Sequence, residues 1–135
     1  MFKKVIEYRD YNGVERKETH YFHLSQAELM KMEMGITGGF TQMVEKLIDA
    51  KDVPQLMTVF EDMIQKSYGV KTPDGKGFSK KKEYLEAFME TPAYSILFME
   101  LATNTEKASE FVNGIMPDDL PKDNGNLSVV PAPNN

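Results

Sequence analysis

Cysteine and tryptophan are absent from this 135-residue chain, and histidine occurs only twice. Without cysteine the chain can form no disulfide, no thiolate metal site and no cysteine nucleophile. His20 and His23 are three positions apart in a predicted strand, so they point to opposite faces, and no third ligand is near them in sequence. Neither a zinc site nor serine–histidine catalysis is therefore supported. We expect no enzymatic activity, no cofactor and no metal.

Long hydrophobic runs are also missing. No stretch approaches the roughly 20 apolar residues of a membrane-spanning helix, and the apolar start at residues 2–6 is too short for a signal peptide. Basic residues number 16 against 21 acidic ones, giving a net charge of −5, whereas nucleic-acid-binding domains usually carry a basic surplus. We expect a soluble intracellular protein that binds neither membrane nor nucleic acid.

Three polar or glycine-rich segments have compositions that occur in ligand sites. Residues 35–39 lack the lysine–hydroxyl ending of a phosphate-binding loop, so they are interpreted as a linker between helices. Residues 71–83 carry five basic and two acidic groups; a solvated loop is the preferred interpretation, and a phosphate or acidic-partner contact is the alternative. Asp118, Asp119 and Asp123 do not follow calcium-loop spacing.

The chain opens with a predicted β-hairpin over residues 2–9 and 14–23, because Asn-Gly between alternating runs is a strong hairpin signal. A two-residue loop would place Glu7 opposite Glu18, and like charges directly opposed destabilise a ladder. A three-residue loop instead pairs Arg9 with Glu15, Glu7 with Lys17 and Phe2 with Phe22. We predict that register, with Gly13 in a left-handed bulge position.

Helices are predicted after the hairpin. Ser25 and Glu28 have the spacing of a capping box, with Leu24 and Leu29 as a hydrophobic staple, and this helix runs to about residue 34. A second amphipathic helix covers residues 40–50. A third has Pro54 in its first turn and stops at Gly69; its predicted buried stripe is Val53, Leu56, Met57, Phe60, Met63 and Ile64.

A tight turn is predicted at residues 72–75, where proline presets one dihedral angle. Ser79 is predicted to cap a fourth helix. The segment 93–117 then reads as two further helices, with Thr91 and Thr105 as caps and with Gly114 and Pro117 closing the second. Apolar residues recur in both at helical spacing: Tyr94, Leu97, Phe98, Leu101 and Ala102, then Ala108, Phe111, Val112, Ile115 and Met116.

From residue 117 the chain has four prolines and no aromatic residue, so it cannot bury enough apolar surface to offset its ordering entropy. The sequence therefore predicts an α+β fold: an N-terminal β-hairpin followed by five or six short α-helices. Residues 1–116 form this mostly helical single domain, and residues 117–135 form a disordered, Pro/Asn-rich C-terminal tail.

Methionine is unusually frequent, with ten in 135 residues. Its unbranched, polarizable side chain fills gaps in cores and also serves surfaces that bind varied partners. Met30 and Met34 share one helix face, whereas Val59, Ile96 and Met99 fall outside the predicted core stripes and suggest an extra apolar surface. We predict that Met30, Met34, Ile96 and Met99 contact a partner polypeptide.

Three stretches of the chain carry a family resemblance: AYSILFMELAT with its FVNGI ending, DYNGVERKETHYFHLSQAELMKMEM, and SYGVKTPDGKGF. They thread through residues 1–117 and resemble the tail assembly chaperones of long-tailed bacteriophages of Gram-positive hosts. The resemblance implies a protein that binds and solubilises the phage tape measure protein and helps recruit tail tube subunits. It also implies action in the host bacterial cytoplasm and absence from the mature virion.

Two alternatives remain open from the sequence. The chain could be a virion structural protein, such as a tail or connector subunit, and the hairpin edge would then pair strands between subunits. The same edge also offers a route to self-association of a chaperone. A small phage regulator that binds nucleic acid through residues 71–83 is the other alternative, against which the acidic net charge weighs.

Overall fold

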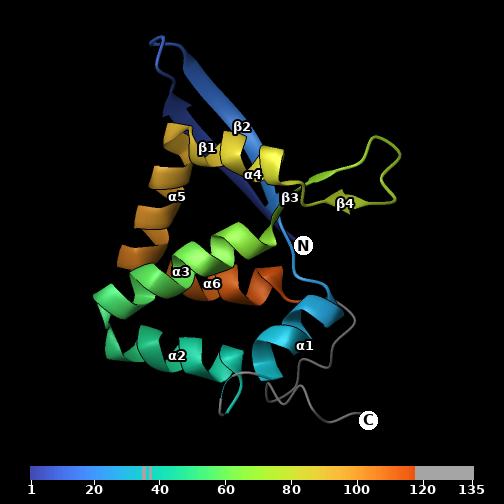
Figure 1. Ribbon diagram of the computed structural model, residues 1–135. Helices are drawn as coiled ribbons and strands as arrows, with labels where there is room; N and C mark the ends of the chain where they lie inside the picture. The colour runs from blue at the N-terminus through green and yellow to red at the C-terminus, as the bar shows by residue number, and fades with distance from the viewer. Residues whose placement is uncertain (35, 37, 118–135) are drawn as a thin grey trace.

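The computed structural model describes residues 1–34, 36 and 38–117, and it confirms an N-terminal antiparallel hairpin followed by six helices within that range. Figure 1 shows the hairpin rising from a helical body. The elements, in chain order, are β1 (Phe2–Arg9), β2 (Glu15–Phe22), α1 (Gln26–Met34), α2 (Phe40–Ala50), α3 (Val53–Ser67), β3 (Tyr68–Lys71), β4 (Phe78–Ser79), α4 (Lys82–Met89), α5 (Pro92–Thr103) and α6 (Thr105–Ile115).

The hairpin register is the predicted one. Arg9 lies opposite Glu15, Glu7 opposite Lys17 and Phe2 opposite Phe22. Gly13 has a φ of 80°, which a residue without Cβ adopts at little cost. The charge pattern along the two strands therefore predicted the length of the loop between β1 and β2 correctly.

A second hairpin, which the sequence analysis missed, extends this sheet to the order β1-β2-β3-β4. Residue 69 was expected to stop α3, but the helix already ends at Ser67 and the chain continues as β3, with Tyr68 opposite Phe22. The predicted turn at 72–75 is confirmed, since the Gly75 N–H donates to the Thr72 carbonyl at 2.8 Å. The predicted cap at Ser79 is wrong: Ser79 lies in β4, opposite Val70.

Local capping chemistry accounts for some of the helix starts, with three corrections. Thr91 occupies the N-cap position of α5 as predicted, but its side chain makes no capping hydrogen bond. The Ser25 N–H donates to Glu28 at 2.8 Å and the Glu28 N–H donates to the Ser25 hydroxyl at 3.2 Å, so the capping box is confirmed. Helix α4 begins at Lys82, after Lys81, without a side-chain cap. Asn104, not Thr105, caps α6, because its side chain accepts the Lys107 N–H at 3.0 Å. Asparagine and threonine both suit an N-cap position, so residue type alone could not show which of the two caps α6.

Aromatic rings fill the core between the sheet and the helices. Phe22 is fully buried, and its ring centroid lies within 5.6 to 6.3 Å of those of four other aromatic residues, namely Phe2, Tyr68, Phe88 and Phe111. The predicted stripes of α5 and α6 face this core, with residues such as Leu97, Leu101, Phe111 and Val112 buried.

Gly114 was expected to help close the last helix, but it lies inside α6, which runs to Ile115. The reason is a close approach of the first strand. A Cβ at position 114 would lie 2.5 Å from the Phe2 ring, so glycine leaves the space that this ring occupies. The beginning of the chain thus packs directly on its last described helix.

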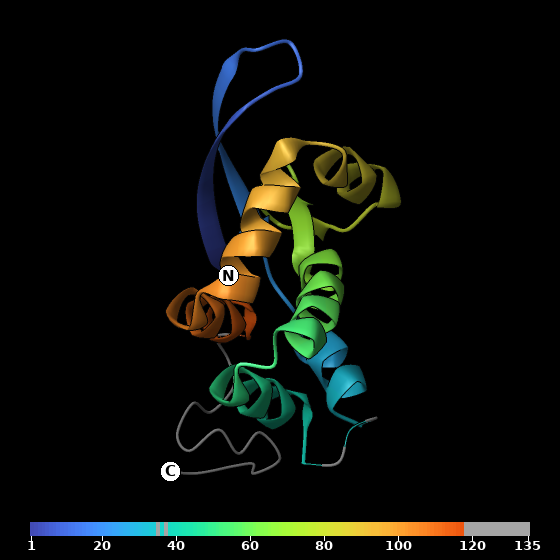
Figure 2. The ribbon, with the colours of Figure 1, turned by 90° about the vertical axis from the view of Figure 1, so that its left-hand side faces the viewer.

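Two views define the overall arrangement. Helix α5 runs beside the hairpin, α4 crosses in front of it in Figure 1, and α1, α2, α3 and α6 form the lower body (Figures 1 and 2). The Leu24 N–H donates to the Ile115 carbonyl at 2.8 Å and joins the start of α1 to the end of α6. The predicted tail lies outside the described residues, including Asp118, Asp119 and Asp123, apart from Pro117, which is buried.

Candidate partner-binding surface

The four predicted contact residues all lie on the surface. Met30 and Met34 on α1 are 63% and 80% exposed, and Ile96 and Met99 on α5 are 44% and 47% exposed. Each pair is spaced by three or four positions, so its two members lie on the same side of their helix. Exposure of these apolar side chains to water is unfavourable in free energy, and a partner that covered them would remove this cost.

The two pairs do not form one groove. Helix α1 lies at the bottom right of the molecule in Figure 1, whereas α5 lies on its left, beside the hairpin. Figure 2 shows the same separation from a second direction. The structure therefore offers two small apolar surfaces, one on α1 and one on α5.

Helix α3 corrects the sequence interpretation of three further residues. Val53 and Met57 were assigned to its buried stripe, but they are 41% and 37% exposed. Val59, which the spacing predicts to be on the surface, is partly buried and packs against the core. The helix turns the face carrying Leu56, Phe60, Met63 and Ile64 inward, and residues at the borders of that face could not be assigned from spacing alone.

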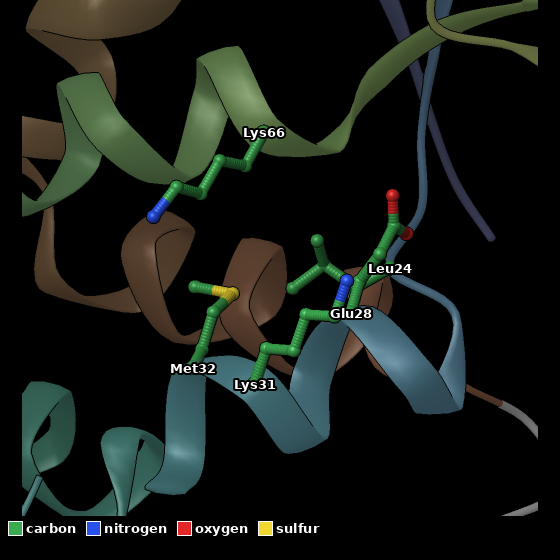
Figure 3. Close-up of a pocket in the computed structure, with 5 residues that line it drawn as sticks. All are labelled: Leu24, Glu28, Lys31, Met32 and Lys66. Carbon is green, nitrogen blue, oxygen red and sulfur yellow. The ribbon is translucent and has the colours of Figure 1, made fainter. Parts of the chain in front are cut away.

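A groove that the sequence analysis did not foresee lies between α1 and α3. Its lining residues are Leu24, Glu28, Lys31, Met32 and Lys66, and its volume is about 270 Å³. In Figure 3 Met32 points from α1 toward α3, Lys31 extends along α1 toward Glu28, and Lys66 extends along α3 on the opposite border of the same space. Residues 24–32 and residue 66 are distant in sequence, so only the packing of the two helices reveals this site.

Lys80 fixes the end of this groove. Its ammonium group donates to the Glu28 carboxylate at 2.8 Å and to the backbone carbonyls of His23 and Lys66 at 2.7 and 2.9 Å. Burial would raise the pKa of Glu28, but hydrogen bonds from Lys80 and the Ser25 backbone outweigh it and lower that pKa. Lys80 therefore ties β4, α1 and α3 together and keeps Glu28 ionised.

The basic segment 71–83 uses much of its charge internally. Besides Lys80, the Lys71 ammonium lies 4.4 Å from the Tyr21 ring centroid, Lys81 lies 5.9 Å from the Tyr84 ring, and Lys82 lies 3.7 Å from Glu86. Four of the five lysines in this segment therefore already contact an aromatic ring, a carboxylate or a carbonyl group of the protein. These contacts favour the interpretation of a solvated loop.

The histidines pack against aromatic rings. The His20 ring lies 4.7 Å from Phe88 and 6.0 Å from Tyr68, and burial lowers its pKa despite the nearby Glu18. The His23 ring lies 6.2 Å from Phe78.

Within residues 1–34, 36 and 38–117, no group of three or more His, Asp or Glu side chains is placed to hold a metal ion. In that same range, no helix has the length and apolar character to cross a membrane.

A model of the phage tail assembly chaperone family matches residues 1–128, nearly the full length of the chain. The protein therefore belongs to the phage tail assembly chaperone family. Neither the search of curated proteins nor the search of solved structures found a match.

Proposed function

We propose that this protein binds the tape measure protein of its phage, keeps it soluble, and helps recruit tail tube subunits to it. Membership of the tail assembly chaperone family supports a role with phage tail proteins in general. Binding of the tape measure protein is supported by one observation, the exposed apolar residues on two helices: Met30 and Met34 on α1, and Ile96 and Met99 on α5.

A long helical protein with apolar stripes is prone to aggregate until it is sheathed. Short helices that expose methionine can receive amphipathic segments of varied sequence, because the thioether side chain adapts to different shapes. Two separate surfaces on one small protein allow two weak contacts, and these together hold a long chain more firmly than either alone. Each chaperone still leaves readily when tube subunits arrive.

The proposed role is non-catalytic, as is general for tail assembly chaperones. We infer that it is carried out in the host bacterial cytoplasm and that the protein is absent from the mature virion. Mass spectrometry of purified particles tests the second point: a virion structural subunit would be present at the stoichiometry of a tail component. Self-association through the edge strand β1 stays a prediction, which size-exclusion chromatography with light scattering would test.

Co-expression with the tape measure protein tests the main proposal. We expect that protein to remain in the soluble fraction with the wild-type chaperone and to precipitate without it. Ile96→Lys should reduce the soluble fraction, whereas Asn113→Lys, an equal change of charge at an exposed site of α6, should not. Equal solubility with and without the chaperone would refute the proposal.

A further inference from the structure

The groove between α1 and α3 combines an apolar floor with cationic walls. Leu24 is fully buried beneath it, and Met32 is partly buried against the core. Lys31 on α1 and Lys66 on α3 border the same space, and both are exposed (Figure 3). An apolar side chain that enters here meets carbon and sulfur below and an ammonium group on either side.

The groove has a surplus of positive charge. Its one lining carboxylate, Glu28, is already bound by Lys80 and by the Ser25 N–H, each at 2.8 Å. Lys66 lies 3.1 Å from Asp62, one turn earlier on α3, in a pair that is about half exposed and so contributes little. Lys31 forms no ion pair within the described part of the chain. The two border lysines are therefore available to carboxylates from outside.

The dimensions and walls of the groove restrict what it can bind. A volume of about 270 Å³ lies just below the range of about 300–1,000 Å³ typical of small-molecule pockets, which suits one or two side chains of a polypeptide. Both walls are helices, whose backbone groups are already bonded internally, so the groove offers no free strand edge. A bound segment must satisfy its own backbone hydrogen bonds, and a helix does so.

We propose that this groove binds an amphipathic helix of the tape measure protein with acidic residues beside its apolar stripe. One apolar side chain enters between α1 and α3, and Asp or Glu residues three or four positions away pair with Lys31 and Lys66. This inference rests on the proposed function and names the sequence type that the chaperone selects. Lys80 contributes by holding the two walls at a fixed separation.

Overlapping synthetic peptides of the tape measure protein, measured by fluorescence anisotropy, test this directly. The groove variant is Lys31→Glu with Lys66→Glu, and the matched control is Lys46→Glu with Lys82→Glu, which changes the net charge equally on exposed sites of α2 and α4. We expect acidic amphipathic peptides to bind the wild type. Their dissociation constants should rise about tenfold in the groove variant and less than twofold in the control.

The possible outcomes separate the two proposals. If peptides bind the wild type and the groove variant equally but lose affinity for Ile96→Lys, the groove proposal fails and the proposed function survives. If no peptide binds the wild type, both fail. If the groove variant instead loses self-association in light scattering while peptide binding is unchanged, the occupant is a second copy of the chain, and the groove proposal is again wrong.

Discussion

Replacement of Lys80 by methionine should destabilise the protein far more than its surface position suggests. The ammonium group of Lys80 donates to two backbone carbonyls and one carboxylate that belong to segments up to 57 positions away. Hydrogen bonds to charged groups contribute about 1.5–3 kcal/mol each when buried. The Lys80 side chain is 24% exposed and the freed carbonyls can rehydrate, so we expect a total loss of about 2 kcal/mol.

Thermal unfolding followed by circular dichroism measures this loss. About 2 kcal/mol corresponds to a Tm lower by roughly 8 °C in a domain of this size. Lys82→Met is the matched control, because Lys82 is 82% exposed and its pairing with Glu86 spans 3.7 Å on one helix. That control should change Tm by less than about 2 °C. Equal Tm values for the two variants would refute the proposed role of Lys80.

The ion pair between Lys80 and Glu28 also predicts that the free energy of unfolding depends on pH. Because the pKa of Glu28 is lower in the folded protein than in the unfolded chain, its contribution to stability is present above the unfolded pKa. That contribution is lost as pH falls through the folded pKa. The free energy of unfolding, measured with urea between about pH 6 and 3, should therefore fall less steeply for Lys80→Met than for the wild type.

Three further predictions concern the fold. Phe22→Ala should lower the free energy of unfolding by about 3–5 kcal/mol, because it empties a fully buried site among four aromatic rings; a loss below about 1 kcal/mol in urea titration would contradict this packing. Gly13→Val should destabilise the protein more than Gly13→Asn, since asparagine tolerates the positive φ of that position, and melting curves of the two variants give the comparison. Stability should also decline below about pH 6.5, because burial lowers the pKa of His20 and an unfolded histidine binds the proton more readily. His20→Gln should flatten the pH dependence in that window, and an unchanged profile would exclude His20 as its source.

Local sequence signals were sufficient for most of the elements. The hairpin register followed from pairing Arg9 with Glu15 and Glu7 with Lys17, and α1 followed from the Ser25–Glu28 capping box. These interactions join residues close in sequence, so short windows contain the information. The inward stripes of α5 and α6 were readable for the same reason.

The elements that were missed are short or depend on distant partners. Strand β3 is four residues long and follows α3 directly; its first two residues pair with β2, more than 45 positions earlier, and its last two pair with the two-residue strand β4. The groove between α1 and α3 likewise needs Lys80 to meet Glu28 across 52 positions. Exposure of Met30, Met34, Ile96 and Met99 agreed with their expected surface position, but their separation on two faces could not be seen from helical spacing.

The packing of the first strand on the last helix has a consequence during synthesis. Phe2 contacts Phe111 and occupies the space beside Gly114. Because translation proceeds from the N-terminus, the hairpin leaves the ribosome long before α6, the helix that covers it. Until α6 emerges, the inward rings of the nascent hairpin stay open to water or to other chains. The protein that we propose to shield another polypeptide from aggregation thus passes through an exposed stage itself, and a ribosome stalled before residue 105 would hold it there.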